Sequence, residues 1–117
     1  MGIAIKRVYD EAAGSDGRRV LVDRLWPRGL SKDKAALDDW CKDVAPSDDL
    51  RRWFGHDPDK WDEFRKRFRA ELDDNEDGWK PLLAMAKKHD TLTLLYAARD
   101  EKHNNAVVLA DYLGKKR

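Results

Sequence analysis

The sequence is poor in cysteine and in long apolar runs. One cysteine in 117 residues allows no disulfide within the chain, which is typical of a reducing cytoplasm. The apolar stretch 91–98 is far shorter than the roughly 20 residues that a membrane-spanning helix needs. Lys6 and Arg7 interrupt the apolar residues at the N-terminus, where a signal peptide would continue. We therefore expect a cytoplasmic protein without a membrane segment.

Excess charge of either sign is also missing. The 24 Lys and Arg residues face 23 Asp and Glu residues, so the formal net charge is only +1. This balance does not favour nucleic acid as a partner, because nucleic-acid-binding domains usually carry a large basic excess. What is present is enough apolar material for a core, since hydrophobic residues make up 41% of the chain. Its length fits one domain, and we expect residues 1–117 to form a single compact domain of unknown oligomeric state.

The distribution of apolar residues predicts an α/β or α+β fold with a small mixed sheet of about three strands and four to five helices. Strands are expected at 3–9, 19–26 and 91–98, and the last one is apolar enough for the interior of a sheet. The loop between the first two is too short for a helical crossover, so direct pairing between them would have to be antiparallel.

Capping residues and helical periodicity predict the helices. Ser31 begins one that runs toward Trp40 and Cys41, and Ser47 caps a short one. The Asp57-Pro58 pair begins a third, whose buried stripe is Trp61, Phe64, Phe68 and Leu72. Two more are expected at about 78–89 and 103–113, the last ended by Gly114.

Polar residues follow two of the expected strands, where open α/β sheets commonly bind ligands. The second strand leads into Asp23, Arg24 and a Trp-Pro-Arg-Gly loop at 26–29. The last strand leads to the start of a helix, whose free amide hydrogens suit a phosphate or a carboxylate. We expect a pocket for a small anionic ligand, with these ligand-binding candidates: Arg24, Trp26, Arg28, Arg99 and Asn104.

Structural roles are the alternative for several of these residues. Asp23 and Arg24 can pair with strand neighbours, and Asp100 is better explained as a cap of the last helix. For Arg28, set between Pro27 and Gly29, the structural and the binding interpretations are equally supported.

Candidates for acid–base chemistry are few. His56 and His103 are the plausible groups near neutral pH, and Asp23 is a further weak candidate for a catalytic role. His56 lies in a helix junction, where histidines often just satisfy loop carbonyls. Whether the protein is an enzyme stays open. We expect no cofactor and no metal, since Cys41 and the histidines lack the close spacing of zinc ligands.

A second hypothesis is a module that binds nucleic acid or another protein. Its surface would combine Trp53 with basic residues of the central helices: Arg51, Arg52, Arg65, Lys66 and Arg69. Acidic residues interleave with this run, so a solvated helix face is its simplest interpretation.

Several motifs together resemble the YeaO-like branch of domain of unknown function family 488. The most specific is the Asp-Arg-Leu-Trp-Pro-Arg-Gly run at 23–29. The others are Lys6–Asp10, Ala45–Ser47, Trp53–Phe54, His56–Pro58, Leu94–Ala98 and His103–Asn104. The resemblance implies a compact bacterial-type cytosolic α/β protein with no established reaction.

The chain departs from the wider family at the last strand. The resemblance implies a cysteine where this sequence has Tyr96, and a His-Cys-His-Arg turn where it has His103-Asn104-Asn105-Ala106. In the YeaO-like branch the position of Asn105 is typically a histidine. A cysteine-dependent mechanism therefore cannot be carried over to this chain.

Overall fold

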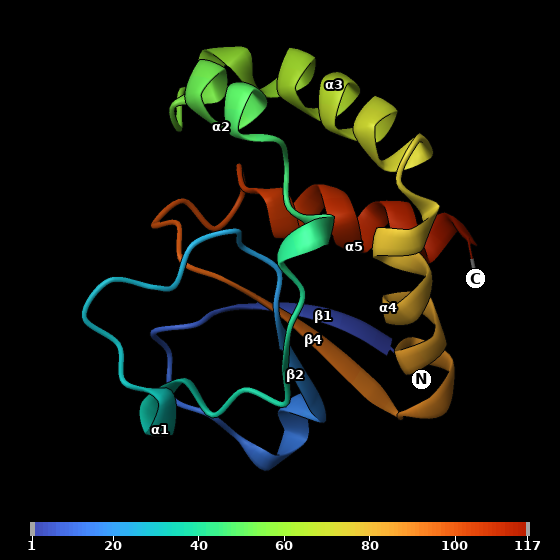
Figure 1. The fold of residues 1–117 in the computed structure, drawn as a ribbon. Coiled ribbons are helices and arrows are strands. Elements are labelled where there is room, and N and C mark those ends of the chain that lie inside the picture. The colour runs from blue at the N-terminus through green and yellow to red at the C-terminus, as the bar shows by residue number, and fades with distance from the viewer. Residues whose placement is uncertain (1, 117) are drawn as a thin grey trace.

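The computed structural model describes residues 2–116 and contains a four-stranded parallel sheet with helices packed against it (Figure 1). The strands are β1 (Gly2–Arg7), β2 (Arg18–Leu21), β3 (Asp39–Trp40) and β4 (Thr91–Tyr96), in the order β1-β4-β2-β3. All three neighbouring pairs are parallel. The α/β class is confirmed. The expectation of a mixed sheet of about three strands is wrong, because the sheet is parallel throughout and includes the short β3.

The strands β1 and β2 do not pair with each other, because β4 lies between them. Segment 8–17 returns from the end of β1 to the start of β2 without an α-helix. The connection must run back along β1, which is about 20 Å long, and cross two strand spacings, which together are about 10 Å. Ten extended residues can span about 33 Å. An extended connection is therefore long enough to make the two strands parallel, and the sequence-based argument for an antiparallel pair does not apply.

The helices cover one face of the sheet in two layers (Figure 1). Next to the sheet lie α4 (Glu76–Lys88) and α5 (Asn105–Lys116). The helix α3 (Trp61–Asp73) packs on both of them, and α2 (Asp48–Phe54) packs on α3. The main core fills the space between, with side chains from every layer: Phe54, Phe64, Phe68, Leu72, Leu82, Leu92, Leu94 and Leu109. The other face has only a small cluster of Val8, Leu21, Ala35 and Leu95 under the loop that carries α1 (Lys32–Ala35).

Most predicted helices are found close to their expected places. Ser47 caps α2 by accepting a hydrogen bond from the Leu50 N–H at 3.2 Å. In α3 the predicted stripe is buried at Phe64, Phe68 and Leu72, while Trp61 is half-buried. The last helix continues past Gly114 to Lys116, so the expected stop at that glycine is wrong.

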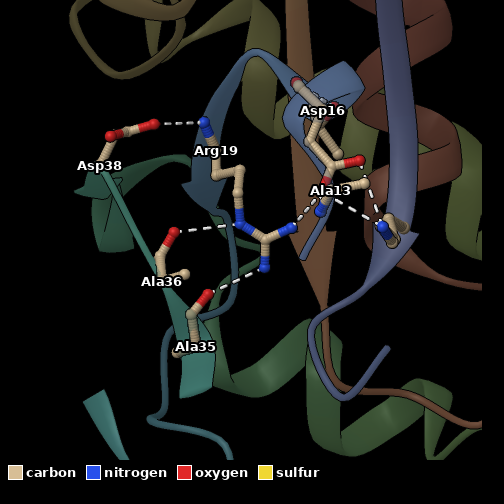
Figure 2. A network of polar contacts seen from close by, with 8 residues as sticks. Ala13, Asp16, Arg19, Ala35, Ala36 and Asp38 are labelled. Carbon is tan, nitrogen blue, oxygen red and sulfur yellow. Dashed lines mark hydrogen bonds and ion pairs between the residues drawn. The ribbon is translucent and has the colours of Figure 1, made fainter. Parts of the chain in front are cut away.

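The helix expected from Ser31 toward Trp40 and Cys41 is wrong beyond its first turn. It ends at Ala35, and the next residue adopts a left-handed conformation with φ of 49°. The cause is Arg19 of β2, whose guanidinium donates to the carbonyls of Ala35 and Ala36 (Figure 2). The chain then pairs with β2 as β3, so a tertiary contact overrides the helix propensity of this segment.

Arg19 belongs to a closed polar network at the amino end of β2 (Figure 2). Its guanidinium also pairs with Asp16, which is contacted by the Lys6 ammonium at 3.1 Å and by the Ala13 N–H at 3.0 Å. Burial raises the pKa of Asp16, but these hydrogen bonds outweigh burial and hold that pKa below its ordinary value. The network fixes the connection between β1 and β2 against the sheet.

The strand β2 ends at Leu21, although the sequence predicts a strand as far as Trp26. The next donor of β4, the Ala97 N–H, bonds to the side chain of Asp23 at 2.9 Å instead of to a strand carbonyl. The backbone is thus free to leave the sheet, and the segment after Val22 becomes a loop.

Candidate functional site

A pocket of about 300 Å³ opens at the carboxyl ends of β2 and β4. It is bordered by the loop after β2, by the loop after β4 with the start of α5, and by α2 and the turn that follows it. Of the residues predicted from the sequence, six line it: Asp23, Arg24, Trp26, Arg28, His56 and Asn104. The remaining lining includes the aromatic side chains Tyr9, Phe54 and Phe64, two prolines, Arg51 and Asn105.

Asp23 is the half-buried carboxylate of the pocket. One oxygen accepts from the Ala97 N–H at 2.9 Å and the other from the Asn105 amide at 3.0 Å. Its own carbonyl accepts from the Trp40 indole at 2.7 Å. Burial raises the pKa of Asp23, and these donors together with the nearby His56 oppose that rise. Within residues 2–116 no Lys, Arg or His side chain forms an ion pair with it.

Arg28 stands on a loop whose shape is fixed by hydrogen bonds. The Tyr9 hydroxyl donates to the Arg28 carbonyl at 2.8 Å, and the Trp26 indole donates to the Leu30 carbonyl at 2.8 Å. Gly29 has a φ of 75°, in the left-handed region that favours glycine. The Arg28 side chain is exposed, and among the described residues its guanidinium has neither a hydrogen-bond nor an ion-pair partner.

Two more arginines reach the pocket with weak local contacts. Arg24 donates to the carbonyls of Ala45 and Pro46, at 3.4 Å in each case. Arg24 and Arg51 lie 3.8 and 3.6 Å from the same carboxylate, that of the exposed Asp48. One aspartate is thus shared by two guanidinium groups, which leaves positive charge beside the pocket.

His56 enters the pocket from the junction between α2 and α3. It has a φ of 58°, a left-handed conformation that costs a residue with a side chain about 1 kcal/mol or more. Its ring lies 6.2 Å from that of Phe54, and its positive charge acts to lower the pKa of Asp23. The histidine therefore lies close enough to Asp23 to act on it electrostatically.

His103 and Arg99, by contrast, do not line the pocket. The His103 Nδ1 lies 2.9 Å from a carboxylate oxygen of Asp100, and its ring edge contacts Trp61 at a centroid distance of 5.2 Å. Arg99 is exposed. These two residues remain predictions without support from the geometry of the pocket.

The cap of α5 is Asn104 rather than Asp100. The Asn104 side-chain oxygen accepts from the Val107 N–H at 3.1 Å. Asp100 instead accepts from the N–H groups of Lys102 and His103 in the preceding turn, and the Lys102 bond leads the contacts that lower its pKa. The expected capping role of Asp100 therefore belongs to Asn104, four residues further along the chain.

The basic face proposed as an interaction surface is neutralised only in part. Arg65 pairs with Asp62 at 3.0 Å, and Arg69 pairs with Asp111 at 2.8 Å. Trp53 is covered by the Arg67 guanidinium at 4.2 Å from the ring centre. Arg51 turns toward the pocket instead of joining this face.

Sequence reasoning missed three kinds of residue in the pocket lining. Arg51 and Phe54 lie three positions apart on α2, and this spacing is the signal that places them on one face. Phe64 was expected only as core. Asn105 was visible as a polar residue at the start of the last helix, but nothing local predicts that its amide reaches Asp23 and the Val22 carbonyl across the fold.

Nucleophilic and metal chemistry find little support in the described residues. Burial raises the pKa of the Cys41 thiol, which keeps it protonated, and Cys41 does not line the pocket. Tyr96 at the end of β4 is 2% exposed, and burial raises its pKa as well. Within residues 2–116, no three His, Cys, Asp or Glu side chains are grouped as metal ligands. No helix in that range has the length and apolar character to cross a membrane.

The fold and the pocket define a small α/β protein with a cleft at the carboxyl ends of parallel strands, lined by apolar side chains and several charged ones. A family model described as the inactive DUF488-N3 subclade matches residues 2–117, and the chain belongs to this family. This agrees with the resemblance found in the sequence motifs.

Curated relatives lead to the same family. The chain is 50% identical to the uncharacterized protein YeaO of Escherichia coli (strain K12) over 113 residues, which cover 97% of each chain. It is 41% identical to the uncharacterized protein Rv3073c of Mycobacterium tuberculosis (strain H37Rv), over 95% of this chain and 92% of the relative. No solved structure matches the chain significantly.

Proposed function

We propose that this protein binds a small ligand with an anionic group, such as a phosphate, in the pocket at the carboxyl ends of β2 and β4. The observation that carries the proposal is the Arg28 side chain, which has no partner among the described residues and stands on a loop fixed by Tyr9 and Trp26. A guanidinium presents a planar fork of donors that matches the oxygens of phosphate and carboxylate.

The surroundings of Arg28 support an anion at this place. Arg24, Arg51 and His56 line the same pocket, and Asp48 is the carboxylate that both of these other arginines approach. Clefts lined by one sign of charge concentrate ligands of the opposite sign. The rest of the lining includes Phe54, Phe64 and two prolines, against which the apolar part of a ligand can pack.

Binding is favoured over turnover. The resemblance implies a cysteine in the wider family at the position where this chain has the buried Tyr96, and the subclade is described as inactive. The half-buried Cys41 lies outside the pocket lining and fits a cytoplasmic protein without disulfides. No observation favours the alternative of a nucleic-acid or protein interaction module, and two of its basic residues, Arg65 and Arg69, are paired with carboxylates.

A thermal-shift screen tests the proposal. The probes are inorganic phosphate, nucleotides, sugar phosphates, dicarboxylates and short oligonucleotides. A ligand at 100 times its Kd stabilises the protein by about 2.7 kcal/mol, which raises the Tm of a domain of this size by several degrees. We expect a small phosphate ester to give such a shift.

Two arginine variants make the screen specific for the pocket. Arg28→Ala should remove the ligand-dependent shift and leave the Tm without ligand nearly unchanged. Arg99→Ala removes an equally exposed arginine outside the pocket and should keep the full shift. A flat screen, or an equal loss of the shift in both variants, would refute the pocket as the binding site.

A further inference from the structure

The pocket contains hydrogen-bond acceptors and a negative charge in addition to its arginines. On the side of the strand ends it presents hydrogen-bond acceptors from Asp23 and Asn105. Both hydrogens of the Asn105 amide are used, one toward the Val22 carbonyl at 3.1 Å and one toward Asp23 at 3.0 Å. The Asn105 side-chain oxygen accepts no hydrogen bond from the described residues, so it adds a free acceptor beside Asp23.

Asp23 lacks the partner that a half-buried carboxylate usually has. Its two oxygens each accept one hydrogen bond, from Ala97 and Asn105, and both of these donors are neutral. A carboxylate can accept about four hydrogen bonds, so lone pairs remain. Buried charges are usually paired with an opposite charge, because neutral donors compensate only part of the lost hydration. Asp23 therefore lies in the pocket as a negative charge available to a cation.

Apolar side chains also line the pocket. Phe54 and Phe64 stack with their ring centres 4.2 Å apart, and both line the pocket together with Pro27 and Pro46. Among the described residues the large hydrophobic side chains that stay exposed are Tyr9 and Leu25, and both line the same pocket. Exposed apolar side chains that gather at one place mark a contact surface.

We propose that the ligand is amphoteric: an amino-substituted phosphate ester whose ammonium group pairs with Asp23 and whose phosphate pairs with Arg28, with a hydrocarbon part between them. This inference rests on the proposed function, since it names the class of ligand for the same pocket. The ammonium supplies the cation and the donors that Asp23 and the Asn105 oxygen lack. The hydrocarbon part covers the phenylalanine and proline side chains.

A matched series of probes tests the inference in the wild-type protein. The ω-aminoalkyl phosphates from aminoethyl to aminohexyl phosphate are compared by calorimetry with alkyl phosphates of the same length and with their N-acetylated forms. At the best chain length we expect the amine to bind about tenfold more tightly than either control, as a charge-assisted contact provides. The N-acetylated probe removes the charge but adds an acetyl group, whereas the plain alkyl phosphate removes the charge without added bulk.

The variant Asp23→Asn locates the contact. Its oxygen can still accept from the Ala97 N–H, while the hydrogen bond with Asn105 is lost and Asn105 keeps its bond to the Val22 carbonyl. We expect it to lose the preference for the amine while it binds the plain alkyl phosphate as tightly as wild type, or more tightly, because a negative charge is gone. A structural role alone would weaken both kinds of probe equally.

The outcomes separate the two proposals. Equal affinity of wild type for the amino, acetylated and plain alkyl phosphates would overturn the amphoteric ligand and leave anion binding in place. No binding of any phosphate would overturn both. Should Asp23→Asn fail to fold, the comparison of the three probes in wild type still decides the question.

Discussion

The two ends of β2 carry the same residue types in opposite states. At the amino end, Asp16 is contacted by Lys6 and Arg19, and each nitrogen of the Arg19 guanidinium has an acceptor. At the carboxyl end, Asp23 has only neutral donors and Arg28 has no partner among the described residues. Charged groups that satisfy one another hold the fold together, whereas charged groups left unmatched are available to a ligand.

Gly17 and Gly29, which both have a positive φ, show the same difference between the two ends of β2. A Cβ on Gly17, next to the closed network, would lie 2.3 Å from the Thr91 carbonyl oxygen. A Cβ on Gly29, in the pocket loop, would meet no atom within 4 Å. The amino end is closely packed against β4, while the pocket loop has open space around it.

The largest effect is expected for Gly17→Ala. The substitution combines a backbone conformation that only glycine adopts readily with overlap on a strand carbonyl, and we expect a loss of about 4 kcal/mol in the free energy of unfolding. Urea unfolding followed by tryptophan fluorescence measures it. A loss below about 1 kcal/mol would show that the segment before β2 yields easily, and the contrast between the two ends would then disappear.

Asp16→Asn should cost about 3 kcal/mol, because it leaves the Arg19 charge buried without its carboxylate. The pKa of Asp16 is lowered in the folded protein, so its contribution is present above the ordinary pKa near 3.8 and is lost as the pH falls through the folded value. The difference in stability between wild type and variant should therefore shrink in acid. Denaturant titrations at neutral and at acidic pH check this, and a difference independent of pH would contradict the assignment.

Gly29→Ala is the matched counterpart at the pocket. It strains only the local backbone, so we expect a loss of about 1 kcal/mol in unfolding free energy. Phosphate binding should weaken, because the substitution displaces Arg28. Thermal melts with and without a bound phosphate ester separate the two effects; an unchanged ligand shift would mean that the loop shape does not position Arg28.

The smallest effect is expected for Tyr9→Phe. It removes the exposed hydrogen bond from the Tyr9 hydroxyl to the Arg28 carbonyl and should cost about 0.5 kcal/mol in stability. The ring stays, so any weakening of phosphate binding reports on the lost bond alone. Calorimetric titration of wild type and variant measures it, with equal affinities as the result that would exclude a role for this bond in positioning Arg28.

Features determined by neighbouring residues were predictable from the sequence. The Ser47 cap and the stripe of α3 depend on residues within a few positions, and the sequence gives them directly. The α/β class follows from the same local patterns. The strand order does not follow from local patterns, because β1 and β2 each pair with β4, which is distant from both in the sequence. The short α1 and β3 escape local reasoning for the same reason, since Arg19 ends the helix from another strand.

The candidate site divides in a similar way. Asp23, Arg24 and Arg28 were predictable because they follow a strand directly, and the end of a parallel strand is a common place for a ligand. His103 and Arg99 also follow a strand, but Asp100 holds His103 outside the pocket lining. Local sequence therefore located the edge of the sheet, while the choice of side chains depends on tertiary contacts.

The central position of β4 governs when the sheet can form. Gly2 pairs with Thr91 and Arg18 pairs with Leu92, whereas β1 and β2 share no pairing of their own. Contacts between such distant residues close large loops before they contribute any stability, which makes folding slow. During synthesis, β1 has no strand to pair with until the ribosome has made residues 91–96. The nascent chain must therefore keep β1 unpaired for most of its translation, while β2 can pair only with the short β3.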